Sequence, residues 1–143
     1  MLHEKSCGAV VYINSQENTT YLLLNYAAGH WDFVKGNVEY GETEKQTVTR
    51  ELQEETMITQ AKFIDNFRES IHYFYRRQGL TINKEVVFFI IESGTDKVEV
   101  SFEHTGYVWL DYPQAMDRLS FKNSRDVLQK AHEYLHKKGL VKK

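Results

Sequence analysis

Residues 36–58 read GNVEYGETEKQTVTRELQEETMI, which is the most informative stretch of the sequence. From Thr43 to about Thr56, apolar positions such as Val48 and Leu52 recur at helical spacing among charged residues, which predicts an amphipathic helix. The acidic residues of the segment GETE at 41–44 suit the first turn, because the amino end of a helix favours negative charge. The stretch is therefore expected to be a loop followed by a helix.

Three glutamates of this helix have a spacing that suggests chemistry. Glu51, Glu54 and Glu55 lie at i, i+3 and i+4, so their carboxylates are expected to project from one face. Like charges at this spacing repel by roughly a few tenths of a kcal/mol per pair, and only Arg50 lies close enough to offset the repulsion. Spacing alone leaves two interpretations: a solvated acidic face, or oxygen ligands for Mg²⁺, which prefers carboxylates, water and phosphates.

The wider pattern favours the second interpretation. Gly36 is followed after five residues by Glu42 and, after seven more, by the run RELQEE at 50–55. This pattern matches the Nudix signature, G-x5-E-x7-R-E-U-x-E-E-x-G-U, and the chain is identified as a member of the Nudix family by that resemblance. Met57 departs from it, because it stands where the family has a glycine in a left-handed turn that disfavours a side chain by ~1 kcal/mol or more. We therefore expect a locally altered helix exit without loss of chemistry.

The resemblance implies a fold of the α/β (α+β) class, in which a mixed β-sheet is sandwiched between helices. It also implies one Nudix hydrolase domain over residues 1–143, with the signature at 36–58. The expected metal ligands are Glu51, Glu54, Glu55 and the backbone carbonyl of Gly36. The ions expected there are Mg²⁺, with Mn²⁺ as the alternative, in two or more copies.

The resemblance also implies how the signature acts. Arg50 is expected to orient the carboxylates through an ion pair, and Glu42 to support the motif electrostatically. The metal ions would neutralise phosphate oxygens and lower the pKa of a water molecule. A glutamate would then take the proton of that water, with Glu55 as the first choice and Glu54 as the other catalytic carboxylate.

Features outside the signature resemble the diadenosine tetraphosphate (Ap4A) hydrolase branch of the family. His30-Trp31 runs into Lys35-Gly36, tyrosines follow Ile58 at the spacing of that branch, and FEH at 102–104 followed by YVWL at 107–110 resembles its H-E-H…Y-x-W-L segment. The substrate-binding residues expected from this resemblance are Lys35, Tyr73, Lys84, Tyr107 and Phe121, and Glu103 is expected to complete a site for several metal ions. Tyr107 and Phe121 are the candidates for stacking on an adenine, which needs two flat walls.

Each of these residues also has a structural interpretation. The aromatics Tyr73, Tyr107 and Phe121 suit a core as well as a base slot, and Glu103 and Lys84 suit a solvated surface. The reaction expected is asymmetric hydrolysis of Ap4A to ATP and AMP. The alternatives are another nucleoside polyphosphate, an RNA 5′ end, an oxidised nucleoside triphosphate, or a non-catalytic domain that senses nucleotides.

Composition narrows the class of protein further. The 143 residues are 41% hydrophobic and 27% charged, which is ordinary for a globular protein. A formal net charge of -2 provides no basic field for a stable nucleic-acid complex, so a small nucleotide is the expected partner. Without a signal segment or a long apolar run, the protein is expected in the cytoplasm and away from membranes. The single Cys7 is expected to be a buried thiol in the first strand.

The rest of the chain is expected to alternate between strands and turns before it ends in helix. A strand at 6–13 is expected to form a hairpin with one at 21–25, and the apolar run at 85–92 reads as the clearest buried strand. The further expectations are short strands at 31–34 and 107–110, two strand segments within 61–75, turns at 76–80 and 93–97, and helix from 111–113 onward and over 124–138.

Overall fold

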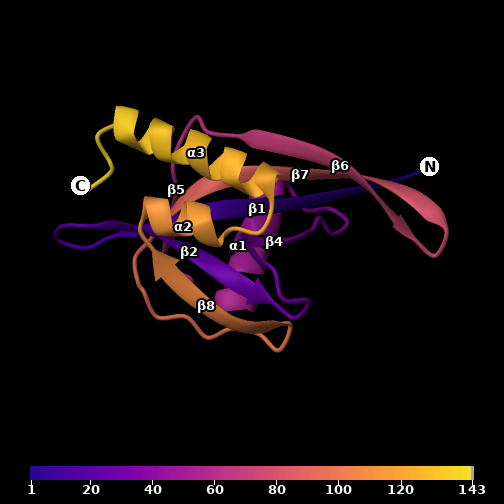
Figure 1. Ribbon diagram of the computed structural model, residues 1–143, viewed down its shortest axis with the longest axis horizontal. Coiled ribbons are helices and arrows are strands. Elements are labelled where there is room, and N and C mark those ends of the chain that lie inside the picture. The colour runs from indigo at the N-terminus through magenta and orange to yellow at the C-terminus, as the bar shows by residue number, and fades with distance from the viewer. Residues whose placement is uncertain (143) are drawn as a thin grey trace.

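The computed structural model describes residues 1–142, which form a sheet of eight strands and three helices (Figure 1). The strands are β1 (Leu2–Asn14), β2 (Thr19–Tyr26), β3 (Trp31–Asp32), β4 (Val34–Asn37), β5 (Ala61–Phe63), β6 (Glu69–Arg77), β7 (Leu80–Ser93) and β8 (His104–Leu110). The helices are α1 (Glu44–Thr56), α2 (Tyr112–Arg118) and α3 (Lys122–Lys137). The predicted mixed architecture is confirmed.

The sheet is mixed because its two longest strands run parallel. Its order is β3-β2-β1-β7-β5, with β4 beside β1, β6 beside β7 and β8 beside β2. β1 pairs in parallel with β7 and antiparallel with β2 and β4. Cys7 of β1 lies opposite Gly36 of β4 on one side and Val87 of β7 on the other. The glycine that opens the signature is therefore held against the centre of the sheet.

Helices cover both faces of this sheet, as the resemblance implied. In Figure 1, α2 and α3 lie in front of the strands and α1 lies behind them. Val48 and Leu52 of α1 pack into one buried apolar cluster, which also contains Cys7. Leu128 and Ala131 of α3 belong to the cluster on the opposite face. Because side chains alternate between the faces of a strand, the central strands β1, β2 and β7 contribute to both clusters.

Most expected elements are present, and the strands are longer than expected. β1 and β2 form the expected hairpin, with Tyr12 opposite Tyr21, and the two segments expected within 61–75 are β5 and β6. Cys7 is fully buried in β1 as expected, and burial raises the pKa of its thiol to about 11. No helix within residues 1–142 is long and apolar enough to span a membrane.

The hairpin of β6 and β7 corrects one expectation. The turn predicted at 76–80 contains only Gln78 and Gly79, whose φ angles of 52° and 79° suit a two-residue hairpin loop. Arg77 and Leu80 instead pair with each other across the two strands. The hairpin therefore continues past the beginning of α3 as an extended arm, and the N-terminal part of β1 runs beside it (Figure 1).

The two ends of α1 are capped in different ways. At the start, the Thr43 hydroxyl accepts from the backbone N–H of Gln46, and the Gln46 side chain accepts from the backbone N–H of Thr43. At the end, Met57 adopts φ 66° and ψ 10°, and its N–H donates to Gln53 O at 2.8 Å. The expected altered exit is therefore wrong, because Met57 itself takes the left-handed conformation that the family gives to glycine.

Replacing Met57 with glycine is expected to raise the free energy of unfolding by up to ~1 kcal/mol, because glycine adopts positive φ without a steric cost. The Met57 side chain is 59% exposed, so little packing is lost. Thermal or urea unfolding measures the change, and Met57→Ala is the matched control because it removes the side chain but keeps the strain. A Met57→Gly protein less stable than the wild type would show that the left-handed exit is relaxed.

Candidate active site

The signature helix lies close against the strand that precedes it. A Cβ atom built at Gly36 of β4 would lie 1.9 Å from Glu51 Oε2, so no side chain fits at this position. The backbone of Gly36 is therefore in direct reach of the first signature carboxylate. Glycine is therefore needed at position 36 because a side chain would collide with Glu51, and not because the backbone adopts a left-handed turn.

Glu51 and Glu55 form a coupled pair of carboxyl groups on α1. Glu55 is only 4% exposed, and its Oε1 accepts from the backbone N–H of Lys35 at 3.4 Å. Burial, and then the charge of Glu51, raise the pKa of Glu55 well above its ordinary value. Burial also raises the pKa of Glu51, and a hydrogen bond joins the two groups. Such a pair holds a proton readily, and it provides two hard oxygen ligands when that proton is lost.

Arg50 connects the rest of the signature, as the resemblance implied. Its guanidinium donates to Glu42 at 2.6 Å, to Glu51 at 3.0 Å and to Glu54 at 3.1 Å, and also to the carbonyl of Asn37 at 2.9 Å. Donation from Arg50 is the largest cause that lowers the pKa of Glu42 to about 2. The arginine therefore fixes the signature helix relative to the loop after β4.

The three helix glutamates do not converge on one point as expected. The Glu54 side chain is 58% exposed and bonds to Arg50, whereas Glu51 and Glu55 face β4 and each other. Within residues 1–142, no three His, Cys, Asp or Glu side chains are gathered closely enough to hold an ion on their own. Helical spacing puts residues on one face, but ion pairing with Arg50 decides where the long Glu54 side chain points.

Tyr26 and Glu103 complete the surroundings of the carboxyl pair. The Tyr26 hydroxyl donates to the carbonyl of Phe33 at 2.6 Å. Burial, with the charges of Glu55, Asp32, Glu51 and Glu103, raises the pKa of Tyr26 well above its ordinary value. The charge of Glu103 also contributes to the raised pKa of Glu55. The charge of Glu103, from the loop before β8, therefore acts on the pair.

The donor set fits a divalent cation. Glu51 and Glu55 are partly or fully buried carboxyl groups whose mutual repulsion a positive ion would relieve, and the backbone of Gly36 lies beside Glu51. Mg²⁺ prefers oxygen donors of this kind and retains several water or phosphate ligands. These residues are therefore the ones that could hold the cation, with Glu54 and Glu103 at the edge of the site.

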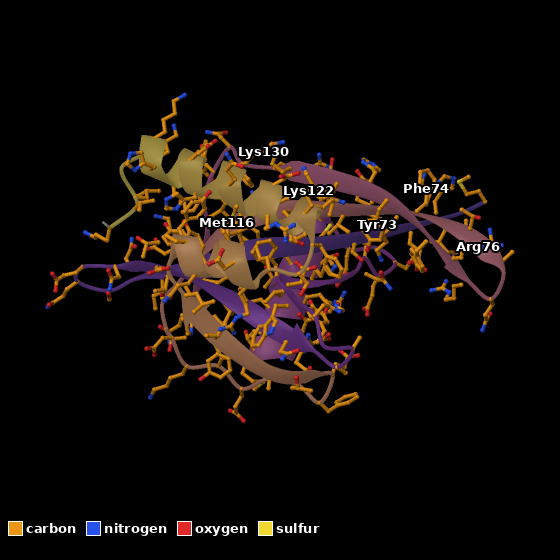
Figure 2. All side chains as sticks on the ribbon, viewed as in Figure 1. Tyr73, Phe74, Arg76, Met116, Lys122 and Lys130 are labelled. Atoms are coloured by element: carbon orange, nitrogen blue, oxygen red, sulfur yellow. The ribbon has the colours of Figure 1, made fainter. Side chains whose placement is uncertain are left out.

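A cavity of about 380 Å³ opens on the face of the sheet that carries α3. Tyr73 of β6 and Phe121, immediately before α3, line it together with Lys35 and Ile71. Figure 2 shows Tyr73 on the hairpin and Lys122 at the start of α3, and Lys122 also lines the cavity. The first turn of α3 lacks a side-chain cap at Phe121, so its backbone N–H groups remain available to an anion.

Asp32 forms the polar floor of this cavity. Its carboxylate is 2% exposed, accepts from Ser124 Oγ at 2.8 Å, and pairs with Lys35 Nζ at 3.1 Å. The same carboxylate therefore holds the beginning of α3 against β3 and aims Lys35 into the cavity. The backbone N–H of Lys35 contacts Glu55 while its side chain lines the cavity, so Lys35 links the cavity to the carboxyl pair.

Stacked rings also join the cavity to the carboxyl pair. His30 stacks on Tyr26 with centroids 4.7 Å apart and planes 11° apart, and it meets Phe121 at 5.1 Å. Burial lowers the pKa of His30, which favours the neutral ring. Aromatic contacts therefore run from Phe121 through His30 to the partly buried Tyr26.

The structure does not bring Tyr107 and Phe121 together. Tyr107 lies opposite Leu24 in the β2–β8 pair, and Leu24 belongs to the cluster under α1. Phe121 lines the cavity on the opposite face, beside α3. Phe121 therefore shares the cavity with Tyr73 and not with Tyr107, because alternation along β8 directs Tyr107 away from the cavity.

Lys84 lies beside the cavity rather than in its lining. It pairs with Tyr73 across the hairpin, so both side chains lie on the same face of the sheet. Its ammonium donates to Asn37 Oδ1 at 2.8 Å, and Asn37 directly follows Gly36. Lys84 is thus held between the cavity and the signature loop, where the sequence placed it as a candidate phosphate contact.

Sequence reasoning missed two residues of this site. They are Asp32, a buried acid that pairs with Lys35, and Tyr26, which ends β2 directly after Asn25. The available signal for Asp32 was its position three residues before Lys35, which permits an ion pair. For Tyr26, the sequence contains no signal that distinguishes it from the other tyrosines.

Comparison with known proteins identifies the family. The Nudix domain family matches residues 4–131. The bis(5′-nucleosyl)-tetraphosphatase [asymmetrical] of Sus scrofa is 35% identical over 92% of this chain and 95% of its own, and that of Mus musculus is 33% identical over the same shares. A crystal structure of a Caenorhabditis elegans Ap4A hydrolase binary complex matches with a TM-score of 0.83 at 28% identity, covering 93% of this chain and 98% of that one. With the signature residues arranged around Gly36 and Arg50, the chain belongs to the Nudix family.

Proposed function

We propose that this protein hydrolyses diadenosine tetraphosphate to ATP and AMP with Mg²⁺ or Mn²⁺, in two or more copies, as its metal. The observation that carries the proposal is the cavity lined by Tyr73, Phe121 and Lys35, because the backbone of Lys35 links this cavity to Glu55 of the carboxyl pair. A cavity of about 380 Å³ lies within the usual range for small-ligand pockets, roughly 300–1,000 Å³. An adenine and its phosphates require such a combination.

Different residues of the chain bind the base and the phosphates. Tyr73 and Phe121 offer flat walls for one adenine, since stacking between a base and an aromatic ring is worth about 1–3 kcal/mol. Lys35, Lys84 and the first turn of α3 supply positive charge and N–H donors for the polyphosphate. When one base is fixed in the slot, the polyphosphate chain always lies in the same position. The same phosphorus is then attacked in every molecule, which accounts for an asymmetric cleavage.

Proton transfer is assigned to Glu55. Its burial and the neighbouring Glu51 give it a raised pKa, so its ionised form is a stronger base than an ordinary carboxylate. A divalent cation held by Glu51, Glu55 and the Gly36 carbonyl, with Glu54 and Glu103 nearby, would neutralise phosphate oxygens and make a water molecule more acidic. Glu55 takes the proton of the attacking water after the proton it shares with Glu51 has left.

The relatives support the same substrate class. The proteins of Sus scrofa and Mus musculus are bis(5′-nucleosyl)-tetraphosphatases of the asymmetrical kind, and they align over 92% of this chain. The structural neighbour from Caenorhabditis elegans is an Ap4A hydrolase. Its likeness covers 93% of this chain and 98% of its own.

Product analysis tests the proposal. With Mg²⁺ present, chromatography should detect equal amounts of ATP and AMP from Ap4A, and hydrolysis in ¹⁸O-labelled water should place the label in AMP. Two molecules of ADP would contradict the asymmetric mechanism. A higher kcat/KM for an RNA 5′ end or an oxidised nucleoside triphosphate would reassign the substrate. Binding without turnover of any nucleotide in the panel would make the protein a sensor.

A further inference from the structure

Glu4 of β1 collects hydrogen-bond donors from both strands of the hairpin. Its Oε1 accepts from the Tyr75 hydroxyl at 2.6 Å and from Lys84 Nζ at 3.3 Å, and its Oε2 pairs with Arg77 at 2.9 Å. Donation from Tyr75, with that from Arg77 and Lys84, lowers the pKa of Glu4 to about 2. Glu4 is therefore a fixed negative charge at the base of the hairpin arm.

The position of Lys84 depends on this charge. The Lys84 side chain is 11% exposed, and its ammonium lies between Glu4 Oε1 and Asn37 Oδ1. Burial lowers the pKa of Lys84, whereas the hydrogen bond and charge of Glu4 oppose that effect. Glu4 thus favours both the protonated state and one orientation of a side chain that is otherwise long and flexible.

Asn37 connects this arrangement to the signature. Its side-chain oxygen accepts from Lys84 at 2.8 Å and from Ser6 at 2.8 Å, while its backbone carbonyl accepts from Arg50 at 2.9 Å. Polar contacts therefore run without interruption from Tyr75 through Glu4, Lys84 and Asn37 to Arg50. Lys35, whose side chain lines the cavity, has a similar partner, since it pairs with Asp32 at 3.1 Å. Each lysine near the cavity is held by one carboxylate.

We propose that Glu4 is a positioning residue for substrate binding, which holds Lys84 charged and aimed at the polyphosphate beside the signature loop. This inference rests on the proposed function, because it assumes that Lys84 contacts a polyphosphate. Glu4 touches no reacting atom, and it acts only through Lys84. Its loss therefore weakens a contact made equally in the ground state and the transition state, which changes KM and leaves kcat nearly unchanged.

The experiment compares Glu4→Gln with the wild type on Ap4A. The amide keeps an oxygen for Tyr75 and Lys84 but removes the charge, so KM should rise roughly 5-fold while kcat stays within about 2-fold. Glu69→Gln is the matched control, because Glu69 lies on the same hairpin and pairs with Lys130 at 3.0 Å. Its KM should equal that of the wild type. Glu4→Asp should recover part of the loss if its shorter carboxylate still reaches the ammonium.

A double-mutant cycle separates positioning from a merely structural role. Lys84→Met should raise KM roughly 10-fold, and adding Glu4→Gln to it should cause no further change, because the effect of Glu4 passes through the ammonium. An unchanged or lower KM for Glu4→Gln would overturn the inference, as would an equal increase in the Lys84→Met background. A wild type inactive on Ap4A would instead overturn the proposed function, so the two failures are distinguishable.

Discussion

Glu55→Gln is expected to lower kcat by at least ~10³-fold, because it removes at once a metal-binding oxygen and the assigned base. The fold should survive the change. The raised pKa of Glu55 favours its neutral carboxyl in the metal-free protein, and glutamine is a neutral isostere. Stability without metal should therefore stay equal or increase slightly.

Steady-state hydrolysis with saturating Mg²⁺ measures the loss, and thermal unfolding of the metal-free protein checks the fold. Glu133→Gln is a suitable control, because Glu133 lies on α3 and contacts only Gln129, at 3.3 Å, among the polar partners in the described residues. Glu55→Gln with turnover near that of the wild type would show that the buried carboxyl pair is not the catalytic centre. A variant that is inactive because it unfolds would show up as a lower melting temperature.

Phe121→Ala and Tyr73→Ala are each expected to raise KM for Ap4A roughly 5- to 150-fold, which corresponds to the loss of about 1–3 kcal/mol of stacking. The effect on kcat should be smaller, because the adenine is bound in the ground state as well as in the transition state. The products should remain ATP and AMP, since Lys35 and the carboxyl pair also determine which phosphorus lies in reach. Initial rates over a substrate series measure both constants.

Tyr107→Ala is the matched control for this prediction. Tyr107 is 42% exposed and Phe121 46%, so the two replacements remove aromatic rings of similar accessibility. Only Phe121 lines the cavity. A rise in KM for Tyr107→Ala equal to that for Phe121→Ala would restore the original aromatic pair. Unfolding of the cavity variants at ordinary temperature with KM unchanged would instead make both rings structural.

The signature helix could be predicted because its spacing carries the information. A glycine that contacts Glu51 and an arginine that reaches Glu42, Glu51 and Glu54 are contained in one local pattern. The burial of Glu55 is not contained in that pattern, because it depends on how the helix packs against β4. The central strands were equally predictable, because burial on both faces leaves a continuous apolar run such as 85–92.

The hairpin arm and the partner of Phe121 could not be predicted in the same way. Strand β6 alternates half-buried and exposed residues outside the main core, and Arg76 and Arg77 resembled a turn although they pair with β7. The face on which Tyr107 lies depends on the register of β8 against β2, which one sequence does not reveal. The Glu4–Lys84 contact joins residues 80 positions apart, and neither has a motif.

The two walls of the proposed adenine slot belong to different layers of the molecule, and this has a consequence for tolerance to mutation. Tyr73 is part of the sheet and Phe121 is attached to α3, so the width of the slot is set by whatever fills the space between those layers. Leu128 and Ala131 are fully buried residues of α3 in the core cluster on this face. They set the distance between α3 and the sheet without lining the slot. A larger side chain at Ala131 would lift the helix and widen the slot. Under the proposed function, substrate affinity therefore depends partly on the hydrophobic core. Substitutions in that core are expected to change which base the slot binds.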